Sequence, residues 1–294
     1  MYKYKVEEYR GDNSWSFKYN LSAIEKKILA DIIHQVLNKY RSPTQTIPFV
    51  KSSIPQLSYL YENLITFFNN NPGEYFLRTS NCSPKDAWYQ LYSETPSADE
   101  IDESVITLEE IERDICVLKV SDAEQCIMVL CHSERIYYDM EFDETENAII
   151  LMPWRKDILL DTETRCFVKN RKLIGFSQYY CDLENGYTSI NQIVTMKHLY
   201  KVIIDFITEF ISNKNFPYLN AVIDIAVSNN IIPTVSSTGS LFQQDDIIFI
   251  EINAFQIDTD SCLYTWEQLF EIDEKATDFS PTFLYKQHNQ VIEI

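Results

Sequence analysis

The sequence predicts an α+β fold, in which helices and strand hairpins are mixed without a regular strand–helix–strand alternation. Three features lead to this prediction. An amphipathic helix pattern follows Ser22, a polar turn at 169–172 joins two strand-like runs, and the apolar stretch 247–255 reads as a buried strand. With 294 residues, the chain has room for one large domain or for two lobes with their own cores.

Composition narrows the class of protein. The 44 acidic and 25 basic residues give a formal charge of −19, and no run of Lys or Arg is visible, which argues against nucleic acid and anionic membranes as partners. We expect a basic or neutral protein partner, or none. Seven cysteines without a CxxC pair predict reduced, buried thiols. Without a signal-peptide pattern or a long apolar run, we expect a cytoplasmic protein that does not span a membrane.

Glycine is scarce, with only five residues in the chain. A Walker A loop or a dinucleotide-binding fingerprint needs clustered glycines, because the backbone must wrap closely around phosphates. Neither motif can be built from this sequence. If the protein binds a nucleotide, side chains and a metal ion must hold the phosphates.

The first 70 residues predict a helical segment. Ser22 and Glu25 have the spacing of a capping box, and the helix that they open ends before Pro43. Its apolar stripe is Ile24, Ile28, Ile32, Val36 and Tyr40, with Leu29, Ile33 and Leu37 beside it. A second helix is expected at 56–69.

The next stretch, 71–154, predicts a smaller mixed layer. A short strand delivers Arg78 into a polar turn, so Arg78 is either part of an anion site or a solvent-facing residue beside a capped helix that starts near residue 83. We then expect a helix opened by Thr107, a strand at 115–120, a helix from Ser121 to about Cys131, and paired strands at 135–142 and 148–151. An acidic loop is expected at 93–104.

The final stretch, 155–294, predicts the larger sheet. A strand hairpin at 163–178 places Arg165 and Phe167 on one face, a helix is expected at 189–212, and a strand at 221–226 carries the single carboxylate of Asp224. The inward side of that helix is predicted to carry Ile193, Met196, Tyr200, Ile203, Ile207 and Phe210. A polar insert at 228–246 precedes the last predicted strand.

Glu251 and Asn253 are the polar residues that interrupt this last strand. Residues two apart on a strand point to the same face, and two oxygen ligands on one face suit a hard cation such as Mg²⁺. The same pattern also fits a strand end where polar residues meet solvent. The spacing alone leaves both readings open.

Several short blocks follow one another in order between Tyr75 and Leu269. They are Ser-Pro-Lys-Asp-Ala at 83–87, Arg-Cys-Phe-Val at 165–168, Lys-Leu-Ile-Gly at 172–175, Ser-Gln at 177–178, Asp224, Glu-Ile-Asn-Ala-Phe at 251–255, Thr-Asp-Ser at 259–261 and Thr-Trp-Glu-Gln-Leu at 265–269. Together they resemble the cell division cycle protein 123 family, a branch of the ATP-grasp fold. Each block alone is a weak signal, whereas the full set in order is specific.

The resemblance implies a two-lobed ATP-grasp fold that clamps ATP and Mg²⁺, with an N-terminal helical segment at 1–70 and lobes at 71–154 and 155–294. It implies that Asp224, Glu251 and Asn253 bind the metal, that Arg78 and Arg165 face phosphate or substrate, and that the 150–154 segment lines the adenine slot. The residues expected to contact ATP are Arg78, Lys85, Ile150, Leu151, Met152, Trp154, Arg165, Asp224, Glu251 and Asn253.

Eukaryotic members of this family are assembly factors for translation initiation factor 2 and bind its gamma subunit, so the resemblance implies this role here. Glu251 stands in place of the family aspartate, Ala254 in place of a proline, and Tyr179 in place of an arginine. Because Glu-x-Asn is a common metal pattern among ATP-grasp enzymes, an ATP-dependent ligase, of the carboxylate–amine or RNA end-joining type, is the alternative. A scaffold that binds no nucleotide is the third possibility.

Overall fold

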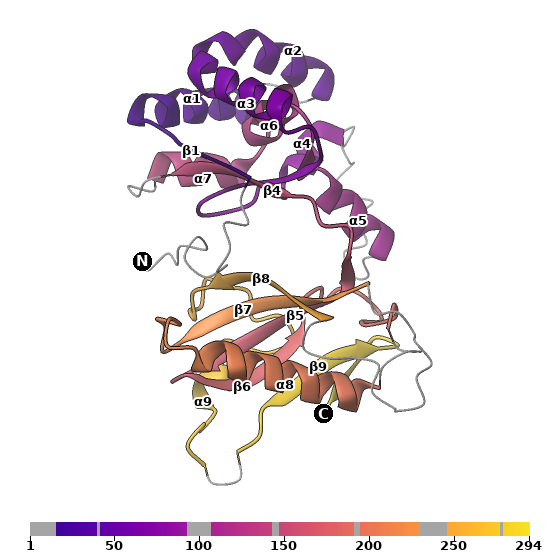
Figure 1. Cartoon of the computed structure of the whole chain (residues 1–294). Helices are drawn as coiled ribbons and strands as arrows, with labels where there is room; N and C mark the ends of the chain where they lie inside the picture. The colour runs from indigo at the N-terminus through magenta and orange to yellow at the C-terminus, as the bar shows by residue number, and fades with distance from the viewer. Residues whose placement is uncertain are drawn as a thin grey trace. The chain divides into compact units, whose positions relative to one another are not determined.

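The computed structural model describes residues 16–39, 42–92, 107–142, 147–190, 195–229, 246–276 and 279–294 (Figure 1). Contacts divide the chain into two compact units. Arg10–Asp102 and Glu109–Trp154 form one, called here the N-terminal unit, and the other, the C-terminal unit, consists mainly of Arg155–Ile294. Among the helices in the described ranges, none combines the length and the apolar character needed to cross a membrane.

The N-terminal unit contains a four-stranded sheet in the order β1-β4-β2-β3, counted over the described residues. Its antiparallel strands are β1 (Phe17–Asn20), β2 (Tyr75–Thr79), β3 (Lys119–Val120) and β4 (Ala148–Pro153). The helices around it are α1 (Ala23–Lys39), α2 (Pro43–Ser53), the 3₁₀ turn η2 (Ile54–Leu57), α3 (Ser58–Asn70), α4 (Ala87–Tyr92), α5 (Leu108–Cys116), α6 (Ala123–Cys131) and α7 (Glu134–Phe142).

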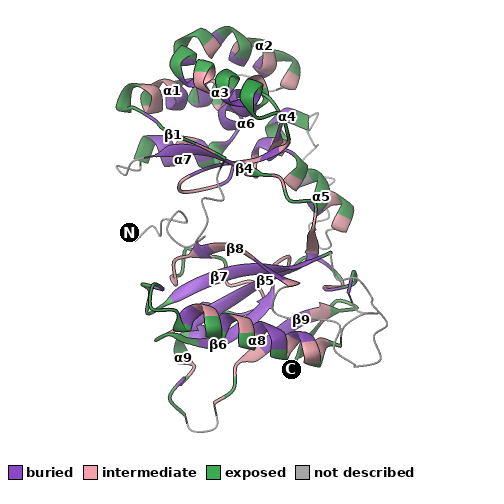
Figure 2. Ribbon diagram, viewed as in Figure 1, coloured by how far each residue is buried: buried purple, intermediate pink, exposed green. Residues whose placement is uncertain are grey.

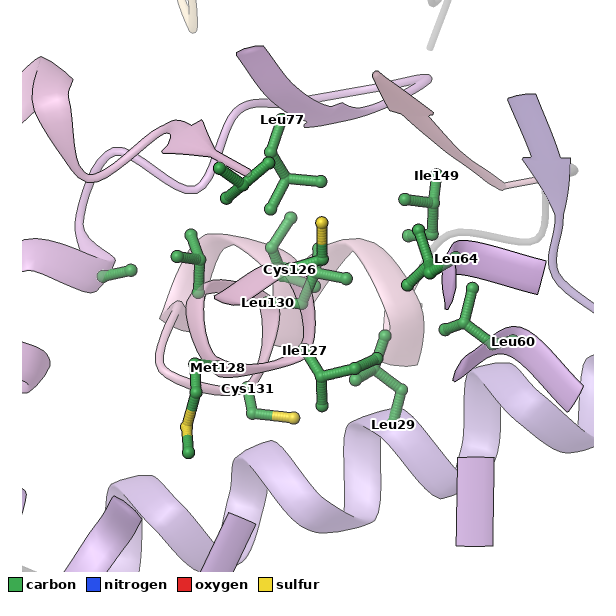
Figure 3. Packing of buried hydrophobic residues seen from close by; sticks show 14 of the residues in the cluster. Leu29, Leu60, Leu64, Leu77, Cys126, Ile127, Met128, Leu130, Cys131 and Ile149 are labelled. Carbon is green, nitrogen blue, oxygen red and sulfur yellow. The ribbon is translucent and has the colours of Figure 1, made fainter. Parts of the chain in front are cut away.

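Helix α6 lies at the centre of this unit. Seven of its residues are buried, namely Ala123 and the six consecutive residues from Cys126 to Cys131, and they face almost every direction around the helix. Figure 3 shows Leu29 of α1, Leu60 and Leu64 of α3, and Leu77 of β2 arranged around α6. A helix that is apolar on all sides is stable only when it is enclosed, so the surrounding helices and the sheet share one hydrophobic core.

The capping box predicted at the start of α1 is confirmed. The Glu25 backbone N–H donates to Ser22 Oγ at 3.2 Å, and the Ser22 backbone N–H donates to Glu25 Oε2 at 2.9 Å. Most of the predicted apolar side is confirmed, because Leu29, Ile32, Ile33 and Val36 are buried. Ile24 is exposed, and Tyr40 lies outside the described residues.

Several predicted elements of this unit are wrong in type or extent. Residues 135–142 form helix α7 instead of a strand, because Ile136 and Met140, one turn apart, are both buried and Ser133 Oγ accepts the Ile136 N–H at 3.1 Å. Helix α2 was not predicted. The strand expected at 115–120 is reduced to the two residues of β3. Helix α6 is capped by Asp122 and not by Ser121, because the Asp122 side chain accepts the Gln125 N–H.

The C-terminal unit contains a six-stranded sheet, counted over the described residues, in the order β10-β9-β6-β5-β7-β8. Its strands are β5 (Ile158–Lys169), β6 (Lys172–Gln178), β7 (Ala221–Ser228), β8 (Ile247–Asn253), β9 (Thr282–Gln287) and β10 (Gln290–Glu293), and only the β6–β9 pair is parallel. Helices α8 (Met196–Ser212) and α9 (Trp266–Glu271) complete the unit. Figure 2 shows that β5 and β7 are buried along most of their length.

The two faces of this sheet carry different cores. Cys166 of β5 and Ile223 of β7 point into the core that α8 covers, whereas Phe167 and Val222 join a second cluster with Trp266 of α9. Because side chains alternate along a strand, Arg165 and Asp224 belong to the α9 face. The hairpin, the strand that holds Asp224 and the α+β class were all predicted and are confirmed.

Helix α8 differs from its prediction. It begins at Met196 after the Thr195 cap, and its buried residues are Leu199, Val202, Ile203, Ile207 and Ile211. Tyr200 and Phe210 only border the core, so the predicted stripe was rotated around the helix. Ile193, the acidic loop at 93–104 and most of the polar insert at 228–246 lie outside the described residues.

Candidate functional site

Strands β7 and β8 bring the three predicted metal ligands together. Asp224 lies directly opposite Glu251 in the antiparallel register. The Asn253 side-chain amide donates to Asp224 Oδ2 at 2.9 Å and to Glu251 Oε1 at 3.3 Å. Asp224 is fully buried, and Glu251 and Asn253 are half-buried. Two carboxylates and one amide therefore meet at a single point on the α9 face of the sheet.

Arg165 of β5 completes this cluster. Its Nε donates to Asp224 Oδ1 at 2.8 Å and its Nη2 to Asp224 Oδ2 at 2.7 Å, in the two-pronged geometry that a guanidinium and a carboxylate form. Burial lowers the pKa of Arg165, but the charge of Asp224 and its hydrogen bonds outweigh burial and raise that pKa. Arg165 therefore remains a cation inside the fold.

Two further contacts to Arg165 were not predicted from the sequence. Its Nη1 donates to the backbone carbonyl of Asp260 at 2.8 Å, and its guanidinium lies 4.6 Å from the centre of the Tyr179 ring. A guanidinium over an aromatic face is stabilised by the ring quadrupole. The available signal was the pairing of Arg165 with Ser177, which puts Tyr179 two residues further along the same face.

Glu163 was also missed. It is buried on β5 two residues before Arg165, and its carbonyl accepts the Tyr179 N–H at 2.9 Å. Buried carboxylates are uncommon and need polar surroundings, so this stretch of β5 is unusually polar for the interior of a sheet. A sequence-only reading had no means to distinguish it from the exposed acids.

The cluster has a donor set that fits a hard cation. Carboxylate and amide oxygens are the ligands that Mg²⁺ accepts in proteins, and the formal charges of Arg165, Asp224 and Glu251 sum to −1. Within the described ranges, no group of three or more His, Cys, Asp or Glu side chains is placed to hold a metal ion. The set here contains only two carboxylates, and the third member, Asn253, is an amide.

Three of the predicted adenine and phosphate residues of the N-terminal unit, Arg78, Ile150 and Met152, share one sheet face. Arg78 lies opposite Ile150, and Phe76 lies opposite Met152, in the register of β2 and β4. Arg78 is buried, and its Nε donates to the Thr79 carbonyl at 3.0 Å, so the solvent-facing alternative is excluded.

The remaining predicted residues of this unit are placed differently. Trp154 stacks near Phe76 with ring centres 6.4 Å apart. Leu151 points to the opposite face of β4 and belongs to the core around α6, and Lys85 is half-buried in the turn before α4.

A groove of about 730 Å³ also lies in the N-terminal unit, between helices α2, α3 and α6. Phe68, Leu91 and Met128 form part of its apolar wall, and Lys51 and Lys119 lie at its polar edge. None of the residues predicted to contact ATP lines this groove. It is therefore separate from the predicted nucleotide residues.

Two curated relatives are similar to the chain. Both are named "Translation initiation factor eIF2 assembly protein". The one from Candida albicans is 26% identical over 147 residues, and the one from Lodderomyces elongisporus is 26% identical over 207 residues. These matches cover 50% and 70% of this chain, but only 37% and 49% of the relatives. The chain thus matches less than half the length of either.

Solved structures of Cdc123 from Schizosaccharomyces pombe have a similar fold. The match to one covers 93% of this chain and 90% of that chain with a TM-score of 0.53 at 18% identity. A C-terminally truncated form matches over 92% and 89% with a TM-score of 0.53 at 19% identity. At this identity the likeness shows the fold alone, and the expected ATP-grasp fold is consistent with it.

A protein-family model described as D123 matches residues 38–293, which is most of the chain. The matched range includes every block on which the predicted resemblance depends. That resemblance is confirmed, and the chain belongs to the D123 family.

Proposed function

We propose that this protein is an ATP- and Mg²⁺-binding assembly factor for translation initiation factor 2, and that it contacts the gamma subunit of that factor in the cytoplasm. Membership of the D123 family and the names of both curated relatives support the assembly role. The acidic surface, with a formal charge of −19, suits a protein partner better than a nucleic acid.

The observation that carries the ATP part of this proposal is the meeting of Asp224, Glu251 and Asn253 beside a buried arginine. Glu251 and Asn253 are proposed to hold Mg²⁺ through side-chain oxygens, with Asp224 as the third ligand. The bound ion would neutralise phosphate charge. Arg165, fixed by Asp224 and the Asp260 carbonyl, is oriented before any ligand arrives, so little entropy is lost when it meets an anion.

The residues proposed to contact the rest of the nucleotide belong to the N-terminal unit. Ile150 and Met152 are apolar residues on one face of β4, and we propose that they contact the planar base. Arg78 lies opposite Ile150 in the sheet, and its side chain is buried. Lys85 and Trp154 are proposed as further contacts and Leu151 as a contact through its backbone, because its side chain is committed to the core.

The experiment combines two assays on the purified full chain. Binding to a purified gamma subunit is measured with and without ATP and Mg²⁺, and release of ADP or AMP is followed in the same mixtures. Binding with negligible turnover supports an assembly factor that uses ATP as a structural ligand. Steady release of ADP or AMP would instead identify the ligase alternative. No binding to the gamma subunit under any condition would contradict the proposed partner.

A further inference from the structure

Helix α9 and the loop before it expose an aromatic surface on the C-terminal unit. Phe270 is 50% exposed and Ile257 is 71% exposed, whereas Trp266 is buried and its ring centre lies 5.3 Å from that of Phe270. The Phe255 ring centre lies 5.1 Å from that of Trp266 and 5.8 Å from that of Phe270. These four residues are called here the α9 surface. Large apolar side chains such as those of Phe270 and Ile257 usually lie inside a fold, so their exposure needs a reason.

The α9 surface is held rigidly. Trp266 Nε1 donates to the Thr259 carbonyl at 2.8 Å, and Thr259 Oγ1 donates to the Ala254 carbonyl at 2.7 Å. Thr265 and Gln268 form a complete capping box at the start of α9. Trp266 also stands edge-on to the fully buried Phe167, with ring centres 6.2 Å apart. Aromatic anchors that are already fixed lose little freedom on binding, which is typical of the energetic centre of an interface.

Acidic residues surround the α9 surface. Glu267 and Glu271 are one helical turn apart and flank Phe270 on α9. The exposed carboxylates of this region are Asp258, Asp260, Glu267, Glu271 and Asp273. The ammonium group of Lys169 donates to the backbone carbonyls of Phe270 in α9 and of Ile272 after it, and that of Lys172 donates to the Glu274 carbonyl. The surface therefore offers an apolar centre inside a rim of negative charge.

This surface is tied to the cluster around Arg165 at both ends of its loop. Ala254 follows Asn253 directly in the chain, and the Asp260 carbonyl accepts a hydrogen bond from Arg165 Nη1 at 2.8 Å. A shift of Arg165 would alter its hydrogen bond to Asp260. A partner bound to the α9 surface would therefore lie next to a loop that contacts the cluster.

The geometry points to the α9 surface as a docking site for a basic protein segment that carries a bulky apolar side chain. The apolar side chain packs on Phe255 and Phe270, and flanking Lys or Arg residues pair with Glu267 and Glu271. A second copy of this chain is disfavoured as the occupant, because two surfaces of the same negative charge repel each other. The inference goes beyond the proposed function and does not depend on ATP binding.

The test selects ligands for the immobilised full chain from a phage library of random short peptides. Selected peptides are synthesised, and their affinity is measured for the wild type, for Phe270→Ser and for Phe142→Ser, a matched control on α7 with a similarly exposed ring. We expect peptides with Lys or Arg around a bulky apolar residue. Phe270→Ser should weaken their binding by at least about tenfold, and Phe142→Ser should leave it unchanged.

Charge is tested with the pair Glu267→Gln and Glu271→Gln against Glu109→Gln and Glu112→Gln, which changes the net charge equally on α5. The first pair should weaken binding about fivefold at low ionic strength, and high salt should remove the difference. Ile257→Ser provides a second apolar variant in case Phe270→Ser fails to fold.

Three results would overturn the inference: no peptide is selected, the selected peptides bind Phe270→Ser as well as wild type, or sedimentation shows a wild-type dimer that Phe270→Ser dissociates. The last result would identify a second copy as the occupant. Because no assay here uses ATP or the gamma subunit, failure of this inference is distinct from failure of the proposed function.

Discussion

Arg165 holds both carboxylate oxygens of Asp224 at 2.7–2.8 Å, and neither side chain exposes more than 5% of its surface. The pair joins β5 to β7 in the middle of the larger sheet, where the two residues lie opposite each other. It therefore has a structural role that is independent of any ligand. Removing one partner leaves a buried charge without its counter-ion, which is more costly than removing both.

Arg165→Met should destabilise the fold by about 3–5 kcal/mol, because the buried Asp224 carboxylate loses its counter-ion. Urea unfolding followed by circular dichroism measures the change. The exposed pair of Lys27 and Asp31, 3.5 Å apart on α1, is the control, and Lys27→Met should cost less than about 0.5 kcal/mol. Equal losses in both variants would show that burial does not strengthen the Arg165 pair.

The contribution of Glu25 to the stability of the fold should depend on pH. Partial burial raises its pKa, but hydrogen bonds from Ser22 and Tyr19 outweigh burial and hold the pKa below the ordinary value of 4.5. A carboxylate with a lowered pKa in the folded state stabilises the fold above its unfolded pKa, and this contribution is lost as the pH falls through the folded pKa.

Wild type should therefore be more stable than Glu25→Gln at neutral pH, and the difference should shrink below a pH of about 4.5. Unfolding curves of both proteins across this range measure it. Ser22→Ala removes a donor to Glu25 and should cost about 1 kcal/mol at neutral pH, with a smaller loss in acid. A difference that stays constant down to the acid end would contradict the assignment.

Cys116 should react first with iodoacetamide. It is exposed at the end of α5, so the expectation that all seven thiols are buried is wrong, although none of them forms a disulfide. Burial and the nearby charge of Asp139 raise the pKa of Cys82 to about 11, and burial also raises the pKa of Cys181 and of Cys262. Because the thiolate is the reactive form, these three should react at least about tenfold more slowly than Cys116 in mild base. Peptide mass mapping over time measures the order of alkylation. Modification of Cys82, Cys181 or Cys262 before Cys116 would contradict the prediction.

Gly175 should not tolerate a side chain. A Cβ added there would lie 2.6 Å from the Tyr264 hydroxyl and 2.9 Å from its Cζ, and Tyr264 is buried with its hydroxyl donating to the Thr282 carbonyl at 2.7 Å. Gly175→Ala should cost about 1–3 kcal/mol. At Gly73 the same atom would make an ordinary contact of 3.5 Å with the Tyr75 ring, so Gly73→Ala should change stability by less than about 0.5 kcal/mol. Thermal unfolding of the two variants measures both changes, and equal losses of stability would contradict the prediction.

Local patterns in the sequence were sufficient for part of the fold. The capping box at Ser22, the hairpin that carries Arg165, and the apolar strand that contains Asp224 depend on neighbours in the chain, and all three are confirmed. The sequence of helix α7 favours a strand locally, because Ile136 is followed by two tyrosines, which are common in strands. Its helical form depends on the burial of Ile136 and Met140. It also depends on Ser133, whose hydroxyl donates at 2.6 Å to Oδ1 of Asp86, a residue 47 positions earlier in the chain.

The candidate site also combines features that local patterns predict with features that depend on tertiary contacts. Alternation along β8 placed Glu251 and Asn253 on one face without any tertiary information. The ion pair between Arg165 and Asp224 depends on the register of β5 against β7, which no local pattern specifies. Tyr179 meets Arg165 through the register of the β5–β6 hairpin, whereas the Asp260 carbonyl comes from a loop 95 residues further along the chain and could be found only in the structure. Helix α2 is hard to predict for a local reason, because proline disfavours a helix except in its first turn. Pro43 lies in that first turn, but Pro48 lies inside the helix.

The most direct test of the proposed metal cluster is calorimetric titration of ATP into wild type and into the double variant Glu251→Ala, Asn253→Ala, each with Mg²⁺ and with EDTA. The exposed Glu293→Ala, on β10, serves as the matched control. The account predicts that Mg²⁺ strengthens ATP binding to wild type and to the control, and that the double variant shows no dependence on Mg²⁺. Binding of ATP by the folded double variant with the same dependence on Mg²⁺ as wild type, or no binding by wild type at all, would contradict it.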